Sequence, residues 1–421
     1  MILELGLFIV MYILLLTLPN YRHLIALVTA IIFIALPTID VYDAFMAVNW
    51  NVILMLLGTM AVVELFIESG MPKKMAEGLL KLVPNVMWAV VVLSLFAGII
   101  SAFVDNVATV LMVAPVGIEI SRKINTNPIP VIISIAVSSN LQGAATLVGD
   151  TTSILLGSYA NLSFNDFFFF KGCLGIFWTV EFGALATIPV ILYLFRKEKN
   201  KVESNSNTIV KDYVPSILML SVIVGLIIAS QFPNKPALTN GYICVSLAII
   251  GTLYEYIRTK DKAVLKNVLG AIDFETLLLL ISLFIVIEGI TQAGVINAIA
   301  NLFMKVGGSS KFVMYTIIVF ASVLISAFVD NIPYVATMLP VVTSLSAMMG
   351  IEPYLFDFGL LIGATLGGNI TPVGASANIA GIGILRKEGY EPTSKDFFRI
   401  GIPFTMVAVI SGYILNWLIW S

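Results

Sequence analysis

Charged residues are scarce in this chain of 421 residues, because Lys, Arg, Asp and Glu together make up only 11% of it. An ordinary globular domain contains about 25% charged residues. Hydrophobic residues make up 59% of this chain, which excludes a soluble enzyme of this length. The 23 basic and 25 acidic residues nearly cancel, which argues against nucleic-acid binding and against a solvated acidic tail. What remains is an all-α polytopic membrane protein, whose partner is the lipid bilayer.

Cysteine and histidine are almost absent. Cys173 and Cys244 lie inside apolar runs and have no metal-type spacing, so we expect no disulfide framework and no cofactor. The one histidine, His23, lies beside Arg22 at the edge of an apolar run. A proton relay built on histidine is therefore not expected.

Ten apolar stretches are long enough to cross a bilayer, which takes about 20 residues in a helix. They cover residues 3–19, 22–37, 50–69, 128–160, 170–195, 213–231, 240–258, 273–292, 354–386 and 401–420. No basic residue precedes the first stretch and no small-residue cleavage site follows it, so we interpret it as a retained helix. The polar stretch 196–212 is a predicted cytoplasmic linker between two halves, 1–195 and 213–421.

Two further apolar regions, 86–122 and 312–348, are too long for one straight span. At about 1.5 Å per residue, each would overshoot a hydrocarbon core of about 30 Å. Each is interrupted near its middle by an Asp-Asn pair, Asp105-Asn106 and Asp330-Asn331. We therefore predict two re-entrant hairpins of paired half-helices, whose polar tips lie at membrane depth inside the protein.

The distribution of basic residues predicts the orientation. If the N-terminus lies outside and each hairpin returns to its own side, the inside receives 19 of the 23 basic residues, including Arg22. The outside receives only Lys171, Lys235, Lys305 and Lys311. This asymmetry follows the preference of Lys and Arg for cytoplasmic loops. We expect both termini outside the cell membrane and no Lys or Arg within the membrane core.

The two halves of the chain resemble each other. SAFVDN occurs at 101–106 and again at 326–331, an offset of 225. Further pairs at an offset of 224 or 225 are Glu64 and Glu288, Gly70 and Gly294, Thr146 and Thr371, and Gly149 and Gly374. Each half would contain five spans, one hairpin and one broken helix, and an odd number of spans places the copies in opposite orientations. This is the inverted-repeat plan of secondary transporters.

The hairpin tips are the first candidate sites. Asp105 and Asp330 each stand where a second half-helix begins, so each can serve as an N-cap. Each can also bind Na⁺ or a proton, because an ionisable residue within the bilayer is functional by default. Glu64 and Glu288 are interpreted differently, as carboxylates that reach the membrane interface or contact a neighbouring helix.

The second candidate sites are polar interruptions within two of the long spans. Residues 138–153 are SSNLQGAATLVGDTTS and residues 367–378 are GGNITPVGASAN. Small residues there can mark a packing kink, but a broken helix at membrane depth is also typical of backbone that lines a binding site. Asp150 is opposite Ala375 in the repeat, so the first break carries an extra carboxylate. Asp150, alongside Asp105, is the best candidate for a titrating or cation-binding group.

These motifs resemble the ion transporter superfamily, and within it the group of arsenite permeases, P-proteins and citrate transporters. SNLQGAATLVGDTTSILLG and GGNITPVGASAN carry the resemblance, which extends over nearly the whole chain. The run from Gly149 to Ser153, GDTTS, departs from the permeases' usual GDPPN and is more similar to Na⁺/H⁺ antiporters of the NhaD type.

The resemblance implies an elevator-type homodimer that is coupled to Na⁺ or H⁺, and Na⁺ binding at Asp105, Asp150 or Asp330. By position, it implies that the substrate and ion site comprises Asp105, Asn106, Thr109, Asn140, Thr146, Gly149, Asp150, Asp330, Asn331, Thr337, Asn369, Thr371, Gly374 and Asn378. We expect an ion-coupled secondary transporter of a small anion, such as arsenite, citrate or a dicarboxylate. The alternative is a Na⁺/H⁺ antiporter. An intramembrane aspartyl protease is disfavoured because Leu147 stands where its GxGD motif needs glycine.

Overall fold

The computed structural model describes residues 1–36, 38–123, 126–201, 208–232 and 234–421. The middle of the predicted linker, 202–207, lies outside these described residues. The first part of the chain forms α1 (Ile2–Thr17), η1 (Pro19–Tyr21), α2 (Arg22–Ala35), α3 (Val41–Ala47), α4 (Trp50–Glu68), α5 (Met71–Leu80), α6 (Val86–Ser101), α7 (Asn106–Lys123), α8 (Pro128–Gly143), α9 (Thr151–Tyr159), η2 (Asn165–Phe167), β1 (Phe169–Phe170), β2 (Cys173–Leu174) and α10 (Ile176–Leu194).

The second part has helices only. They are α11 (Val214–Ser230), α12 (Thr239–Thr259), α13 (Ala263–Ala271), α14 (Phe274–Gln292), α15 (Val295–Gly307), α16 (Lys311–Ser326), α17 (Asn331–Met349), α18 (Tyr354–Gly367), η3 (Gly368–Ile370), α19 (Ser376–Lys387) and α20 (Ser394–Trp420). From α4 to α10 the elements recur in the same order from α14 to α20, shifted by 224 or 225 residues at most helix starts. The helix starts therefore follow the sequence repeat.

Short polar side chains set many helix starts. Asn49 caps α4 by accepting from Val52 N, and Asn85 caps α6 in the same way. In the second half, Asp273 caps α14 and Ser310 caps α16. Each side chain satisfies an N–H group that has no partner within the helix, which fixes where the apolar helix begins.

The breaks that the sequence predicts at the two Asp-Asn pairs are present. α6 ends at Ser101 and α7 begins at Asn106, while α16 ends at Ser326 and α17 begins at Asn331. Both ends of the first broken region contact the linker, because Val86 N donates to Asn200 O at 3.0 Å and Thr126 Oγ1 donates to Glu198 at 3.4 Å. The chain therefore turns back at the break, as a hairpin does.

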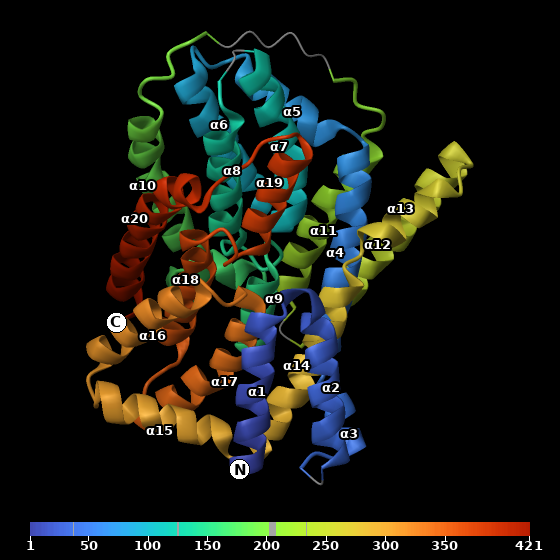
Figure 1. The fold of residues 1–421 in the computed structure, drawn as a ribbon. Helices are drawn as coiled ribbons and strands as arrows, with labels where there is room; N and C mark the ends of the chain where they lie inside the picture. Colours follow the sequence, from blue (N-terminus) through green and yellow to red (C-terminus); the bar gives the residue numbers. More distant parts are fainter. Residues whose placement is uncertain (37, 124–125, 202–207, 233) are drawn as a thin grey trace.

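The two halves are interwoven around their broken helices. The predicted span 128–160 is divided at its polar interruption into α8 and α9. Its counterpart, 354–386, is divided into α18, η3 and α19. α9 packs on α17 and α18 of the second half, whereas α19 packs on α7 and α8 of the first half. Figure 1 shows this exchange, with α19 in the upper part beside α7 and α9 in the lower part near α17. The middle of the molecule is therefore built from both halves.

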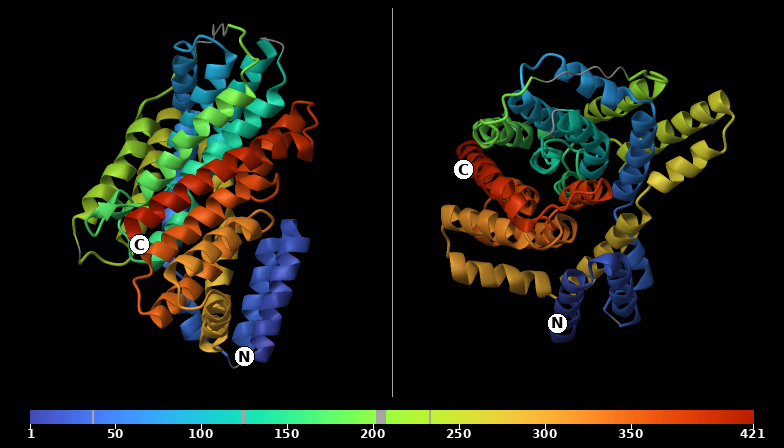
Figure 2. Two further views of the ribbon diagram at one scale, coloured as in Figure 1. Left: turned by 90° about the vertical axis from the view of Figure 1, so that its left-hand side faces the viewer. Right: turned by 45° about the horizontal axis from the view of Figure 1, so that its top comes forward.

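Five described helices are long and apolar enough to cross a membrane, or up to seven if each of two bent helix pairs is one span. One bent pair is α1 with the η1–α2 segment, at 117°, and the other is α15 with α16, at 116°. Figure 2 shows α12 and α13 projecting from the rest of the molecule. These features are those of a helical polytopic membrane protein.

One predicted span needs correction. The stretch from residue 170 is not helical at its start, because Phe169–Phe170 pairs with Cys173–Leu174 across a turn in which Lys171 and Gly172 have positive φ. α10 begins only at Ile176. α1 and α2 have 16 and 14 residues and lie within one or two residues of the predicted stretches 3–19 and 22–37.

Candidate ion and substrate site

A cavity of about 300 Å³ lies where the two halves meet. It is bounded by α4, the tips of both hairpins, the starts of α9 and α19, and the junction of α13 with α14. Its polar lining residues are Glu64, Asp105, Asn106, Asp150, Thr151, Asp273, Thr276, Asn331 and Ser376. Four of these are carboxylates, and the described residues that line the cavity include no Lys or Arg. A cation would therefore be attracted to this site.

Asp105 is both a helix cap and a cavity residue. Its Oδ1 accepts from Val107 N at 2.9 Å and from Ala108 N at 3.2 Å, which caps α7. Within the described part of the chain, its Oδ2 has no hydrogen-bond or ion-pair partner. The capping and ligand-binding interpretations are therefore compatible, because each uses a different oxygen.

Asp150 is buried at the start of α9. Its Oδ1 accepts from Thr151 N and its Oδ2 from Thr152 Oγ1, both at 2.8 Å. The Thr152 hydroxyl also lies 3.1 Å from Thr365 Oγ1 of the other half. Asp150 therefore joins the cavity to a polar contact between the two broken helices.

Asparagines connect the hairpin to both breaks. Asn106 Nδ2 donates to Asn140 Oδ1 at 3.0 Å, and Asn140 Nδ2 donates to Asn369 Oδ1 at 3.0 Å and to Thr365 O at 2.7 Å. Asn369 Nδ2 in turn donates to Val137 O at 2.9 Å. Three of the predicted site residues thus form one buried chain across the centre.

Carbonyl groups converge at each break. A methyl group added to Gly149 would lie within 2.6–2.7 Å of the carbonyl oxygens of Ser101, Ala102 and Gly143. At Gly374 the equivalent oxygens are those of Ser326, Ala327 and Gly368, at 2.6–2.9 Å. Thr146 donates to Ala102 O, and Thr371 donates to Ala327 O in the same way. Each hairpin is therefore fastened to the break of its own half by matching contacts.

The remaining predicted residues differ in their surroundings. Thr109 is buried, and its hydroxyl has no partner within the described part of the chain. Asn331 lines the cavity, and its Nδ2 likewise has no partner there. Asn378 Nδ2 donates to Gly368 O and Thr371 O, which ties the start of α19 to η3.

Asp330 is not among the described residues that line the cavity. Its Oδ2 accepts from Arg22 at 2.8 Å, and its Oδ1 caps α17. Thr337 also lies outside the cavity lining and exchanges a 2.7 Å hydrogen bond with Tyr12 of α1. Arg22, which the sequence places in an inner loop, thus reaches the tip of the second hairpin.

Sequence reasoning missed several residues of this site. Glu64 lines the cavity and does not merely reach the membrane interface. The matched Glu64 and Glu288 pair was the available signal, yet Glu288 instead bonds Gln292 at 2.9 Å on an exposed face. Asp273, Thr276 and Ser376 had no signal of their own, because each lies at a helix start where polar residues are ordinary.

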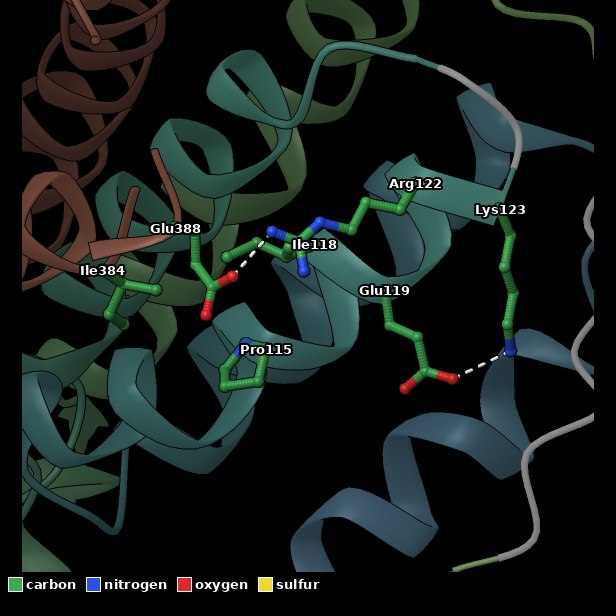
Figure 3. Close-up of a pocket in the computed structure, with 7 residues that line it drawn as sticks. All are labelled: Pro115, Ile118, Glu119, Arg122, Lys123, Ile384 and Glu388. Atoms are coloured by element: carbon green, nitrogen blue, oxygen red, sulfur yellow. Dashed lines mark hydrogen bonds and ion pairs between the residues drawn. The ribbon is translucent and has the colours of Figure 1, made fainter. Parts of the chain in front are cut away.

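A second cavity, of about 270 Å³, lies between α7 and α19 near their charged ends. Figure 3 shows two ion pairs at its edge, Arg122 with Glu388 at 2.6 Å and Lys123 with Glu119 at 2.8 Å. All four side chains are more than a third exposed. Exposed pairs of this kind contribute little stability, and their charges already satisfy each other.

Comparison with known proteins identifies the family. The sequence profile of the family described as "Citrate transporter" (CitMHS) matches residues 12–358 and 263–421. A "46 kDa membrane protein" of Mycobacterium leprae is 30% identical over 99% of this chain and 98% of its own. The "Uncharacterized transporter Rv2684" of Mycobacterium tuberculosis is 30% identical over 94% and 93%. The mouse P protein is 25% identical over 87% of this chain and 53% of its own.

Two solved structures share the fold. The YdaH transporter of Alcanivorax borkumensis has a TM-score of 0.59 at 14% identity, covering 88% of this chain and 85% of its own. MtrF of Neisseria gonorrhoeae, described as belonging to a class of antimetabolite efflux pumps, has a TM-score of 0.57 at 15% identity, covering 87% and 80%.

The apolar helices, the helix breaks and the polar cavity define a membrane transporter. The chain belongs to the citrate transporter family, in the same group as the P protein.

Proposed function

We propose that this protein is an ion-coupled secondary transporter that moves a small anion of the arsenite or citrate and dicarboxylate class across the cell membrane by alternating access. The observation that carries this proposal is a cavity with two chemically different sides. Glu64, Asp105 and Asp150 of the first half supply carboxylates, which suit a cation. On the second-half side, Asp273 adds the fourth carboxylate, Asn331 supplies an N–H donor that has no partner in the described part of the chain, and Ser376 begins α19. A helix N-terminus attracts an anion.

The start of α19 differs from the start of α9. Asp150 caps α9 with its carboxylate, whereas Ala375 at the matching position makes no side-chain cap. The positive end of the α19 dipole is therefore not neutralised by a capping side chain of its own. This asymmetry supports an anion subsite on the side of the second half.

Cation binding would make anion binding possible. An anion that entered alone would be repelled by four carboxylates, and the described lining offers no basic residue to offset them. A cation bound between Asp105 and Asp150 reduces that repulsion. Each ion then raises the affinity for the other, which is the thermodynamic basis of coupling.

The exchange of α9 and α19 between the halves supports an inverted-repeat transport unit. In this proposal both hairpins and both broken helices move together as an elevator against the remaining helices, within a homodimer whose termini lie outside. The matched Thr146 and Thr371 bonds fasten each hairpin to its own break, so the hairpins and breaks form one body.

A second candidate is a Na⁺/H⁺ antiporter of the NhaD type. The four carboxylates of the cavity favour it, because an antiporter of this type binds only cations, and carboxylates attract cations. Ion-resolved flux in proteoliposomes separates the two functions. We would impose Na⁺ and H⁺ gradients separately and follow arsenite, citrate and sulfate. Anion uptake driven by either gradient supports the proposal, whereas Na⁺/H⁺ exchange that no anion affects supports the antiporter.

Two substitutions test which ion each side of the cavity binds. Asp150→Asn should abolish the cation dependence of flux and keep the fold, because Asn caps a helix about as well as Asp. Asn331→Ala should instead raise the KM for the anion about 10- to 150-fold, since a hydrogen bond to a charged group contributes about 1.5–3 kcal/mol. Asn297→Ala, outside the cavity on α15, is the control. Wild-type cation dependence in purified Asp150→Asn would contradict the assignment.

A further inference from the structure

Asp105 and Asp330 occupy matching positions in the two SAFVDN strings, but only one of them is paired with a base. Asp105 Oδ1 caps α7, and within the described part of the chain its Oδ2 has no partner. Asp105 lines the cavity. Asp330 Oδ1 caps α17 at 3.1 Å, and its Oδ2 accepts from Arg22 at 2.8 Å. Both members of this ion pair are largely buried, with side chains 18% and 8% exposed.

The chain holds Arg22 in this position. Arg22 is the first residue of α2, directly after the η1 turn, and its Nε donates to Leu15 O at 3.4 Å. Tyr12 anchors the preceding helix, because its hydroxyl donates to Pro333 O at 2.8 Å and lies 2.7 Å from Thr337 Oγ1. Tyr12 therefore ties α1 to the first turns of α17, and the turn after α1 brings the guanidinium to the tip of the second hairpin.

Among the described residues, no base from the other half pairs with the tip of the first hairpin. α2 packs on α14, and its counterpart α12 packs on α4 in the matching arrangement. At the offset of 224, Arg22 corresponds to Ser246, which lies inside the uninterrupted helix α12. The turn between α1 and α2, which brings a guanidinium to Asp330, thus has no counterpart in α12.

We propose that Arg22 is a tethered cation, which occupies at Asp330 the place that a coupling cation takes at Asp105. This inference rests on the proposed cation-coupled transport. A guanidinium stays charged at any physiological pH and cannot leave, so the carboxylate at the second tip is permanently neutralised. Only the first tip then exchanges an ion with the solution. Arg22 is a positioning residue that sets how many ions accompany each substrate.

The first test measures ion stoichiometry. In proteoliposomes, Arg22→Gln should leave the Asp330 carboxylate without its guanidinium partner, so that it binds a cation from solution. One more cation then accompanies each substrate, which shifts the gradient at which net flux reverses. Arg22→Gln/Asp330→Asn should return the wild-type reversal point, because base and carboxylate disappear together. A pair that merely holds the structure would change the rate or the amount of folded protein in Arg22→Gln, but leave the reversal point unchanged. That outcome overturns the proposal.

The second test does not depend on transport. Dicyclohexylcarbodiimide modifies carboxyl groups that take up a proton in apolar surroundings, and peptide mass spectrometry locates the modified residue. In purified full-length protein, Asp330 should stay unmodified in the wild type and become modified in Arg22→Gln. Arg122→Gln, which breaks the exposed pair with Glu388, is the matched control and should leave Asp330 unmodified.

Equal modification of Asp330 in the wild type and in Arg22→Gln would overturn the proposal. Failure of the proposed function looks different, because wild-type flux then ignores both cation gradients while Asp330 still becomes reactive only in Arg22→Gln. In that case the pair is present, and its role as a tethered coupling ion is excluded.

Discussion

At Gly149 a single methyl group would lie 2.6 Å from two backbone carbonyl oxygens, those of Ser101 and Gly143. These oxygens belong to backbone at the ends of α6 and α8, so they cannot rotate away as a flexible side chain could. We expect Gly149→Ala to separate the first hairpin from its break, to abolish transport and to lower the thermal unfolding temperature of the purified protein. The same substitution at Gly374 should act alike, for the same reason.

Gly383→Ala is the matched control for this prediction. Gly383 lies in α19, and a methyl group there would meet no atom within 4 Å. Alanine also has a higher helix propensity than glycine, by about 1 kcal/mol, so this variant should be at least as stable as the wild type. Normal transport by Gly149→Ala would show that the contacts at the break are not needed for function.

Single residues of the site could be predicted from the sequence only where a polar group interrupts an apolar run. Asp105 and Asp150 stand out in this way, and both line the cavity. Arg22 does not stand out, because it follows a polar turn and its partner Asp330 is 308 residues away. An ion pair across that distance depends on how helices pack, which local composition does not specify.

Asn140 joins the two broken helices to each other and to the first hairpin. It accepts from Asn106 and donates to Asn369 and Thr365 O, and it is fully buried. Asn140→Leu would leave these partners unpaired, and an unsatisfied buried polar group costs about 1–3 kcal/mol. We expect a lower unfolding temperature together with lost transport.

Differential scanning fluorimetry in detergent, with Ser221→Ala as the control, measures this loss of stability. Ser221 lies on α11, and its hydroxyl only returns to Ile217 O of the same helix. Unchanged stability of Asn140→Leu would mean that the asparagine chain does not hold the broken helices together.

Helix breaks were predictable at this scale, but the short helices that precede the two hairpins were not. α5 and α15 are polar or amphipathic and begin after Gly70 and Gly294, whose φ angles are 75° and 77°. The offset of 224 between Gly70 and Gly294 marks this glycine pair in the sequence. Its physical reason is that a left-handed residue turns the chain sharply from a long apolar helix into the next one, and glycine adopts that conformation without strain.

At the scale of the whole molecule, the turn between α1 and α2 is where the predicted topology meets the packing of the helices. The sequence places Arg22 in an inner loop between two spans, and the structure brings this turn to the tip of the second hairpin. Two spans return the chain to its starting side, whereas one bent span would invert every later helix. The predicted orientation therefore stays a prediction.

The orientation itself is testable by the accessibility of single cysteines. The two hairpins should enter from opposite faces, so Lys123→Cys and Lys311→Cys should react with a membrane-impermeant maleimide from opposite sides of the membrane. The background would be Cys173→Ser/Cys244→Ala, which removes both native thiols. Asn200→Cys should react from the same side as Lys123→Cys, because the backbone of Asn200 bonds Val86 at the start of the first hairpin. Reaction of positions 123 and 311 from one side would exclude the inverted arrangement, and with it the alternating-access scheme that depends on opposed hairpins.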